Sequence, residues 1–477
     1  MRSKFIKQFL RFSPIQIFNL VFSLVTFKVT TTFLSASQMG VVNLFQNFFT
    51  LLNSVFFAWI GFVILRYYTH YRAEKKLTIF LSTIAKILIY LISGTFIVAL
   101  SATFFLPTHH NVLLILGIIG LLMTILSSYF STIFQLNNQA RNYTFFNLIN
   151  TILTFCCYIF CIYILKIKTE SIFITSVIVG FSLLIFSIKK HKKLDLDLAK
   201  FDKEILKKTI NYGLPQVITL VSVSLLNFAD RYLINYYSST QAVGEYSAAY
   251  RISEAVILIP LGMVSSIYAP FLYSNFGVKE KEERGLQNIQ NFSNIYLIIF
   301  IPILLIISIN PKYTAILVGS KFPLDYSLVT FIVIGNFIFG YTQILGMALQ
   351  LKEKLKQLTT SIFISALFNI AINVFLIKQY SNKGAAIATM CSYIFYLALL
   401  YYYVIRNTKY RIEKRQISKI MVAASGMFAF LYLIPQDYND LWSFNSIYKL
   451  ILSCLIFYLI LILAKEKNIK EIIAFIK

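Results

Sequence analysis

The chain alternates between long uninterrupted apolar runs and short polar segments that are rich in Lys and Arg. Runs of about 20 apolar residues are long enough to cross a bilayer as a helix. The runs do not alternate apolar with polar residues, as the strands of a membrane barrel would, and a lipid-facing backbone must satisfy its own hydrogen bonds. Hydropathy therefore predicts an all-α integral membrane protein of about 14 transmembrane helices. The predicted spans are Phe12–Ser35, Met39–Leu65, Ile79–Phe105, Val112–Phe134, Thr144–Leu165, Ile172–Ile188, Tyr212–Tyr236, Gly244–Phe271, Phe292–Ile309, Leu328–Leu349, Thr359–Ile377, Gly384–Ile405, Ile417–Ile434 and Ile447–Ala464.

Composition and charge support this interpretation. Hydrophobic residues make up 58% of the 477 residues and charged residues only 13%, whereas a soluble domain carries about 25% charged residues. The net charge of +25 could indicate a nucleic-acid partner. However, 33 of the 44 Lys and Arg belong to segments predicted on one side of the membrane, 6 to the other side and 5 to spans. This asymmetry is a topology signal, so we expect both termini in the cytoplasm and no nucleic-acid partner.

The charges and a faint internal repeat predict the domain organisation. The longest predicted cytoplasmic segment is basic and follows the sixth span, at residues 189–208. It would link a six-helix bundle at 1–188 to a second at 209–405, with two peripheral helices and a cytoplasmic tail at 406–477. Pro14, Lys28 and Gly40 in the first half have counterparts at similar spacing in Pro215, Asp230 and Gly244. Six helices per half predict two bundles related by a pseudo-two-fold axis along the membrane normal.

Charged residues inside the spans are the candidate functional residues, because burial of a charge in a membrane is costly. Lys28, Asp230, Arg231, Arg251 and Glu254 fall at a similar depth in the predicted outer half of the membrane. We expect them to line one water-filled cavity in which cations outnumber carboxylates. Such a cavity favours an anionic ligand, above all a phosphate or pyrophosphate.

Several of these residues have a structural alternative. Arg251 and Glu254, three residues apart on a helix, could simply pair with each other, and Asp230 could pair with a neighbouring Arg. Lys86, the fourth candidate cation for the cavity, could instead extend its ammonium to the membrane interface. Lys28 has no acid nearby in sequence and interrupts the first apolar run, which we expect to remain as an uncleaved first helix.

Metal and cofactor chemistry are not expected. The cysteines Cys156, Cys157, Cys161, Cys391 and Cys454 lie inside apolar runs without the spacing of a zinc site. His109 and His110 have no Asp or Glu nearby. Phosphate-binding loops of ATP-hydrolysing proteins and dinucleotide fingerprints are also absent from the sequence, so neither a metal site nor a cofactor is predicted.

Three stretches resemble the polysaccharide flippases of the multidrug/oligosaccharidyl-lipid/polysaccharide exporter superfamily. The first is NYGLP at 211–215 followed by NFADRYLI at 227–234. The second is VGEYSAAYRI at 243–252, and the third is NIAINVFLI at 369–377 with GAAIAT at 384–389. Their order and spacing are similar to those of the family, and the resemblance covers nearly the whole chain.

The resemblance implies a function. A flippase of this kind moves undecaprenyl-pyrophosphate-linked oligosaccharide repeat units from the cytoplasmic to the outer leaflet by alternating access, for O-antigen or capsule synthesis. Coupling to a proton or sodium gradient is common in the superfamily, and Asp230 or Glu254 are the candidate ion-coupling or gating residues. The cations predicted from the charges inside the spans, Lys28, Arg231, Arg251 and Lys86, would bind the substrate. We further expect a bacterial inner-membrane location, a monomer surrounded by membrane lipids, and polysaccharide polymerase and chain-length proteins as partners.

Two other classes of function stay open. The first is an ion-coupled multidrug exporter, or another lipid exporter of the same superfamily, although a site for cationic drugs would be apolar or acidic. The second is a membrane glycosyltransferase or polymerase. Such enzymes generally place acidic residues or a large folded loop on the outer side, and the predicted outer loops here are short. The sequence therefore favours a transporter and not an enzyme.

Overall fold

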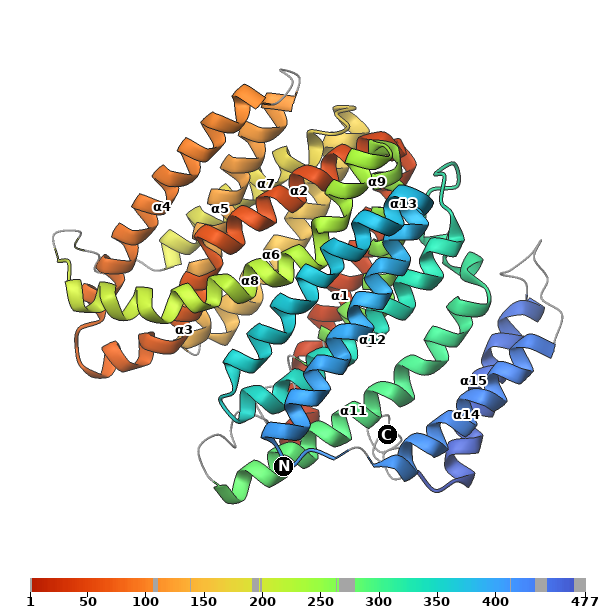
Figure 1. Ribbon diagram of the computed structural model, residues 1–477. Coiled ribbons are helices and arrows are strands. Elements are labelled where there is room, and N and C mark those ends of the chain that lie inside the picture. Colours follow the sequence, from red (N-terminus) through yellow and green to blue (C-terminus); the bar gives the residue numbers. More distant parts are fainter. Residues whose placement is uncertain are drawn as a thin grey trace. The chain divides into compact units, whose positions relative to one another are not determined.

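The computed structural model describes residues 2–105, 110–137, 139–190, 197, 200–262, 264–265, 279–411, 413–433 and 444–466. This part of the chain is almost entirely helical (Figure 1). Eleven stretches of it are long and apolar enough to cross a membrane by length and composition, and Phe18–Phe33 is a shorter apolar helix. All fourteen predicted spans coincide with helical residues, although the ends of the eighth and thirteenth, Phe271 and Ile434, lie outside the described residues. The prediction of an all-α membrane protein is confirmed.

The helices are labelled as in Figure 1. The first seven are α1 (Arg2–Phe33), α2 (Ala36–Phe56), α3 (Ala58–Ala73), α4 (Leu77–Phe105), α5 (Asn111–Leu136), α6 (Ala140–Ile159) and α7 (Ser171–Lys190). The next seven are α8 (Lys203–Tyr237), α9 (Thr240–Ser253), α11 (Lys279–Ile309), α12 (Tyr326–Leu351), α13 (Leu355–Asn407), α14 (Lys414–Leu433) and α15 (Phe444–Leu463). Two π-helical segments, η2 (Phe160–Ile164) and η3 (Glu254–Leu258), continue α6 and α9, and the 3-10 helix η4 (Pro311–Leu317) follows α11.

Three of the predicted spans are divided into helices differently from the prediction. The second predicted span is broken at Phe57, whose φ of −125° and ψ of −40° separate α2 from α3. The hydroxyl of Tyr129 on α5 donates a 2.7 Å hydrogen bond to the Phe57 carbonyl, which satisfies a backbone group at the break. The eleventh and twelfth spans form one element, α13, with a kink at Ser381, whose φ is +50°. A Cβ at Gly384 would lie 2.0 Å from the Leu376 carbonyl oxygen, so the chain after the kink requires glycine there.

By compactness the chain divides into two units, which are residues 29–232 and residues 1–28 together with 233–477. We call them the first unit and the second unit. This division separates the start of α1 from its end and assigns most of α8 to the first unit. It does not coincide with the predicted bundles at 1–188 and 209–405, which stay a prediction.

The first unit is built around α5 and α7, which pack against each other. Glycines allow this close approach: a Cβ at Gly120 would lie 2.0 Å from the Ser176 hydroxyl, and one at Gly180 would lie 2.8 Å from the Cβ of Met123. Rings from α2 and α7 fill the adjacent core, with Phe49 and Phe173 centred 5.7 Å apart.

Part of the predicted basic linker is docked on the first unit. The backbone N–H groups of Asp197 and Asp202 donate hydrogen bonds to the hydroxyls of Ser82 and Thr83 on α4. The Asp202 carboxylate accepts hydrogen bonds from the N–H groups of Glu204 and Ile205, which caps the start of α8. Residues 191–196 and 198–199 of the predicted linker lie outside the described residues.

In the second unit, α12 and α13 pack side by side, and α11 contacts both α12 and α14. An apolar cluster with Ile298, Ala423, Met427 and Phe457 joins α11 to α14 and α15. The Asn294 amide on α11 donates a hydrogen bond to the Gln416 amide oxygen on α14 within this contact. The last two helices therefore form a hairpin that is attached to α11.

Candidate functional site

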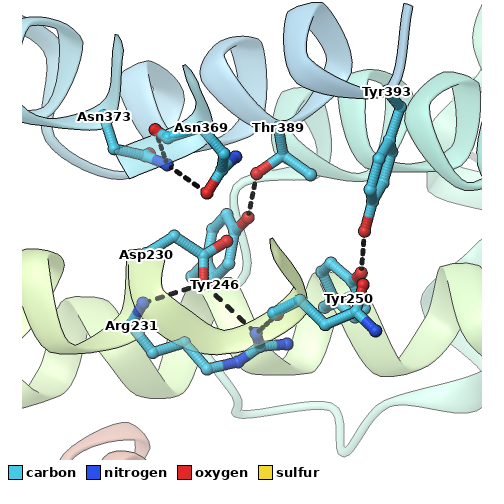
Figure 2. A network of polar contacts seen from close by, with 9 residues as sticks. Asp230, Arg231, Tyr246, Tyr250, Asn369, Asn373, Thr389 and Tyr393 are labelled. Carbon is cyan, nitrogen blue, oxygen red and sulfur yellow. Dashed lines mark hydrogen bonds and ion pairs between the residues drawn. The ribbon is translucent and has the colours of Figure 1, made fainter. Parts of the chain in front are cut away.

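Two of the predicted charges form a buried pair on α8 in the first unit (Figure 2). The Asp230 carboxylate accepts a 2.8 Å hydrogen bond from the backbone N–H of Arg231, and the Arg231 guanidinium lies 3.3 Å from the same carboxylate oxygen. The guanidinium also donates to the Asn227 carbonyl and lies over the Phe228 ring. Asp230 is 1% exposed and Arg231 4% exposed. The alternative in which Asp230 pairs with a neighbouring Arg is therefore confirmed.

A second pair lies where α9 meets the π-helical segment η3 in the second unit. The guanidinium of Arg251 is 3.2 Å from the Glu254 carboxylate, and it donates a 2.8 Å hydrogen bond to the Ser23 hydroxyl of α1. The Arg251 side chain is 44% exposed and that of Glu254 27%. Single π-helical turns frequently mark functional sites. In contrast to the Asp230–Arg231 pair, this pair is accessible to a ligand.

The two candidate lysines lie apart from these pairs in the chain. Lys28 is exposed on α1, five residues after Ser23, which corresponds to about 7.5 Å along a helix axis. Lys86 is half-buried on α4 with its ammonium 4.9 Å from the centre of the Phe201 ring, in a cation–π contact. Phe201 belongs to the predicted linker, so Lys86 contacts a docked segment of its own unit.

The six predicted residues are therefore divided between the units. Lys28, Arg251 and Glu254 belong to the second unit, and Lys86, Asp230 and Arg231 to the first. Each arginine lies beside a carboxylate, one or three residues away in the sequence. Their assignment to one substrate cavity stays a prediction.

The second unit also contains buried neutral polar groups, which were not among the predicted charged residues. The Tyr246 hydroxyl of α9 lies 3.2 Å from the Thr389 hydroxyl of α13, and the Tyr250 hydroxyl lies 2.7 Å from that of Tyr393 (Figure 2). These hydrogen bonds join α9 to the second half of α13. The sequence contains a signal for these contacts, because hydroxyl side chains recur four residues apart on both helices, and buried hydroxyls need a hydrogen-bond partner.

A second group of neutral side chains lies on α13 itself. The Asn373 amide donates hydrogen bonds to the Asn369 carbonyl and amide oxygens (Figure 2). The Asn369 amide donates to the Ser392 hydroxyl. The amide oxygen of Asn373 has no hydrogen-bond partner within the described residues. These side chains are fully buried and hold the two halves of α13 together.

The described residues contain no group of three or more His, Cys, Asp or Glu that could hold a metal ion. His110 packs edge-on against the Phe45 ring, 5.7 Å away, and His109 lies outside the described residues. All five cysteines are free thiols.

Comparisons with known proteins agree with the sequence motifs. The family model described as polysaccharide biosynthesis protein matches residues 6–276, more than half of the chain, and the MatE family model matches residues 215–375. A curated relative, the probable low-salt glycan biosynthesis flippase Agl15 of Haloferax volcanii, is 23% identical over 260 residues. This match covers 54% of each chain, so the chain spans about half the length of that relative.

Solved structures share the fold. The lipid II flippase MurJ in an inward closed conformation has a TM-score of 0.64 and 18% identity, covering 94% of this chain and 98% of its own. An inward-facing multidrug resistance transporter of the MATE family has a TM-score of 0.65 and 14% identity, covering 81% of this chain and 94% of its own. The chain thus has the fold of a superfamily of transporters, and it belongs to the polysaccharide biosynthesis protein family.

Proposed function

We propose that this protein is a flippase for lipid-linked glycan precursors. Its cargo would be an undecaprenyl-pyrophosphate-linked oligosaccharide repeat unit, moved from the cytoplasmic to the outer leaflet for synthesis of O-antigen, capsule or another surface polysaccharide. The observation that carries the proposal is the polysaccharide biosynthesis family match over residues 6–276. The name of the Haloferax relative and the fold shared with a lipid II flippase support it.

In this proposal Arg251 and Lys28 are the first contacts of the pyrophosphate. Arg251 has an exposed guanidinium, which offers the paired N–H donors that suit phosphate oxygens. It is tied to α1 through Ser23, and Lys28 lies on the same helix. Arg231 and Lys86 are the other candidate cations. Arg231 is the weaker of these two, because a phosphate would have to displace its buried carboxylate partner.

Asp230 and Glu254 are the proposed coupling or gating residues. A carboxylate inside a membrane protein binds a proton or cation when its basic partner is withdrawn, and that change can drive a conformational equilibrium. Replacement of Asp230 by Asn should abolish the dependence of transport on an ion gradient. Transport by that variant with an unchanged ion dependence would exclude Asp230 from coupling.

The larger arrangement is also a proposal. Alternating access would come from rocking of bundles at 1–188 and 209–405, with the helices at 406–477 peripheral. Both termini would lie in the cytoplasm, and the protein would be a monomer in the bacterial inner membrane. Polysaccharide polymerase and chain-length proteins would be its functional partners.

A second candidate is an ion-coupled multidrug or other lipid exporter. The match of the MatE model to residues 215–375 and the fold shared with a multidrug transporter favour it. The two candidates differ in the ligand, because a cationic drug would not need Arg251 or Lys28. A drug exporter would also leave surface polysaccharide unchanged when deleted.

The decisive experiment is deletion of the gene in its host, followed by assay of surface polysaccharide and of lipid-linked oligosaccharides. Loss of the polymer with accumulation of repeat units on the cytoplasmic leaflet is the expected result. Unchanged polymer without accumulated intermediates, in a strain in which related genes are also deleted, would refute the flippase proposal.

Complementation of the deletion strain then tests the cations. The variants Lys28→Ala and Arg251→Ala should each restore little or no polymer at a normal membrane level. The matched control is Lys321→Ala, which removes an exposed lysine after η4. Full polymer synthesis with both test variants would exclude these residues from substrate binding.

A further inference from the structure

One face of α2 in the first unit is polar along the length of the helix and carries no charge. It consists of Asn43, Gln46, Asn47, Thr50, Asn53 and Ser54. At 3.6 residues per turn these positions fall within about 120° of the helix circumference. A second face, with Val42, Phe45, Phe49 and Leu52, is buried in the apolar core of the unit.

The middle of this polar face is exposed. Gln46 and Thr50 are exposed, and Asn43 and Asn53 are half-buried. The amides of Gln46 and Asn53 make no hydrogen bond with the described residues. Exposed amides in the middle of a membrane-spanning helix are costly against lipid, because each would lose its hydrogen bonds to water. The face must therefore meet water or a polar ligand.

Asn47 gives an independent indication of a ligand. Its side chain is 7% exposed, and its amide nitrogen has no hydrogen-bond acceptor within the described residues. Buried side-chain amides are usually satisfied, but this nitrogen has almost no exposed surface, so a ligand acceptor reaches it only after the Asn47 side chain moves. Thr50 donates to the Gln46 carbonyl, so its exposed hydroxyl oxygen keeps lone pairs for a ligand.

The polar groups of the second unit show what a purely structural role looks like. Asn336, Asn369, Asn373 and Thr389 are at most 1% exposed. Asn336, Asn369 and Thr389 hydrogen-bond to neighbouring helical segments, and Asn373 bonds to Asn369. Polar side chains that join membrane helices are expected to be buried in this way. Within the described part of the chain, Ser54 is the α2 side chain that does so, through a 3.0 Å contact with the Ser224 hydroxyl of α8.

A second helix of the first unit has a similar face. Asn147, Asn150, Thr151 and Thr154 of α6 recur at helical spacing, with Asn150 exposed and the others half-buried. This face also carries no charge. Two helices of one unit thus display amides and hydroxyls where lipid-facing residues would be apolar.

The chemistry of the α2 face indicates its ligand. Amides and hydroxyls both donate and accept hydrogen bonds, which matches the hydroxyl groups of a neutral sugar. Pyrophosphate would instead recruit Arg or Lys, and a polyprenyl tail would need an apolar surface. Gln46, Thr50 and Asn53 extend about 10 Å along the helix, which suits a short oligosaccharide.

We propose that the polar face of α2 binds the sugar portion of the translocated lipid, with Gln46, Thr50 and Asn53 as its central contacts and Asn47 as a buried donor. This inference rests on the proposed flippase function and assigns the glycan a surface distinct from the candidate cations. Sugar and pyrophosphate are then recognised by different side chains, and the α2 face determines which glycans are carried.

The test uses the purified full-length protein in native mass spectrometry with two probes. One is a butanol extract of the host's own polyprenyl-pyrophosphate-linked oligosaccharides, and the other is undecaprenyl pyrophosphate without sugar. The variant combines Gln46→Leu, Thr50→Val and Asn53→Leu. Loss of one neutral hydrogen bond lowers affinity about fivefold, so we expect the triple variant to bind the glycosylated lipids at least about tenfold more weakly. Binding of undecaprenyl pyrophosphate should not change.

Two controls separate binding from folding. Ser93→Val removes an exposed hydroxyl from α4, in a region where Tyr90 and Ile97 are also exposed. This variant should bind the glycosylated lipids and undecaprenyl pyrophosphate as tightly as the wild-type protein does. Gln46→Asn combined with Thr50→Ser keeps hydrogen-bonding groups and should retain most of the binding of glycosylated lipids. Equal weakening for both probes, or no weakening for either, would overturn the assignment of the α2 face. If the wild-type protein binds neither probe, the flippase proposal itself is overturned, and this inference with it.

Discussion

Substitution of Gly180 by Ala tests the packing of α5 against α7. A Cβ at Gly180 would lie 2.8 Å from the Cβ of Met123, 3.0 Å from the Thr124 nitrogen and 3.1 Å from the Met123 carbonyl carbon. The nearest atoms include backbone, so no side-chain rotation relieves the clash. Carbon atoms pack at about 3.5–4.0 Å, and α5 and α7 would have to separate by roughly 1 Å.

The expected energy combines two opposing effects. Overpacking of this kind costs about 1–3 kcal/mol. Replacement of Gly by Ala inside a helix gains about 1 kcal/mol from helix propensity, so we expect a net destabilisation of up to about 2 kcal/mol. Gly61 of α3 is the matched control, because no atom lies within 4 Å of its added Cβ. Gly61→Ala should therefore stabilise the protein by up to about 1 kcal/mol.

Both variants can be compared by SDS-induced unfolding in mixed micelles, followed by circular dichroism. The central expectation is that Gly180→Ala lowers the stability of the protein and Gly61→Ala raises it. If Gly180→Ala is as stable as Gly61→Ala, the close approach of α5 and α7 described here is wrong. Lower stability of both variants would show that helix propensity does not contribute at these positions.

Further substitutions test the ion pairs. Glu254→Gln removes a competitor for the Arg251 guanidinium, and a half-exposed ion pair contributes up to about 1 kcal/mol. The affinity of the variant for undecaprenyl pyrophosphate should therefore rise up to about fivefold in native mass spectrometry, and weaker binding would contradict this reasoning. Partial burial raises the pKa of Asp325, but hydrogen bonds from Ser327 and the ammonium of Lys383 outweigh it, so that the pKa lies below its usual value. The stabilisation of the folded protein by the ionised Asp325 carboxylate is then complete above the ordinary pKa near 4 and is lost as the pH falls further. The melting temperature of the wild-type protein should exceed that of Asp325→Asn, and this difference should shrink below about pH 4. Asp325→Ala also removes the N-cap of α12 and should lower the free energy of unfolding by about 1 kcal/mol more than Asp325→Asn does. A difference in melting temperature between wild type and Asp325→Asn that does not depend on pH would contradict the ion-pair contribution.

The number and type of the helices could be predicted because bilayer thickness imposes long apolar runs. Their boundaries could not. The helix α8 starts at Lys203, nine residues before the predicted span, and α11 starts at Lys279 and not near Phe292. Hydropathy detects the part of a helix that lipid covers, whereas helix ends depend on caps such as Asp202. The break at Phe57 could not be predicted from hydropathy either, because it is stabilised by Tyr129, a residue 72 positions away.

The candidate site was predicted in part. The pairing of Arg251 with Glu254 and of Asp230 with Arg231 followed from their spacing and is confirmed. The contact of Lys86 with Phe201 could not be foreseen, because it depends on docking of a segment that is distant in sequence. The polar face of α2 is present in the sequence at helical spacing, but it carries no charge and so does not stand out among residues that are costly to bury in a membrane.

Pairing of the arginines changes how the substrate would be recognised. A phosphate cannot be attracted by the full charge of Arg231, because that guanidinium already neutralises a buried carboxylate beside it. Arg251 is shared between Glu254 and Ser23, so pyrophosphate binding there means an exchange of partners and little net gain in charge pairing. In the proposed flippase, cations of this kind would hold any pyrophosphate-linked lipid about equally well and would provide little discrimination among glycans. Discrimination then requires neutral hydrogen-bonding groups, which bind a sugar by the arrangement of its hydroxyls and reject an analogue that leaves them unpaired. In the first unit, α2 and α6 display such groups, so differences in cargo among related transporters should follow changes on these two faces while the cations stay the same.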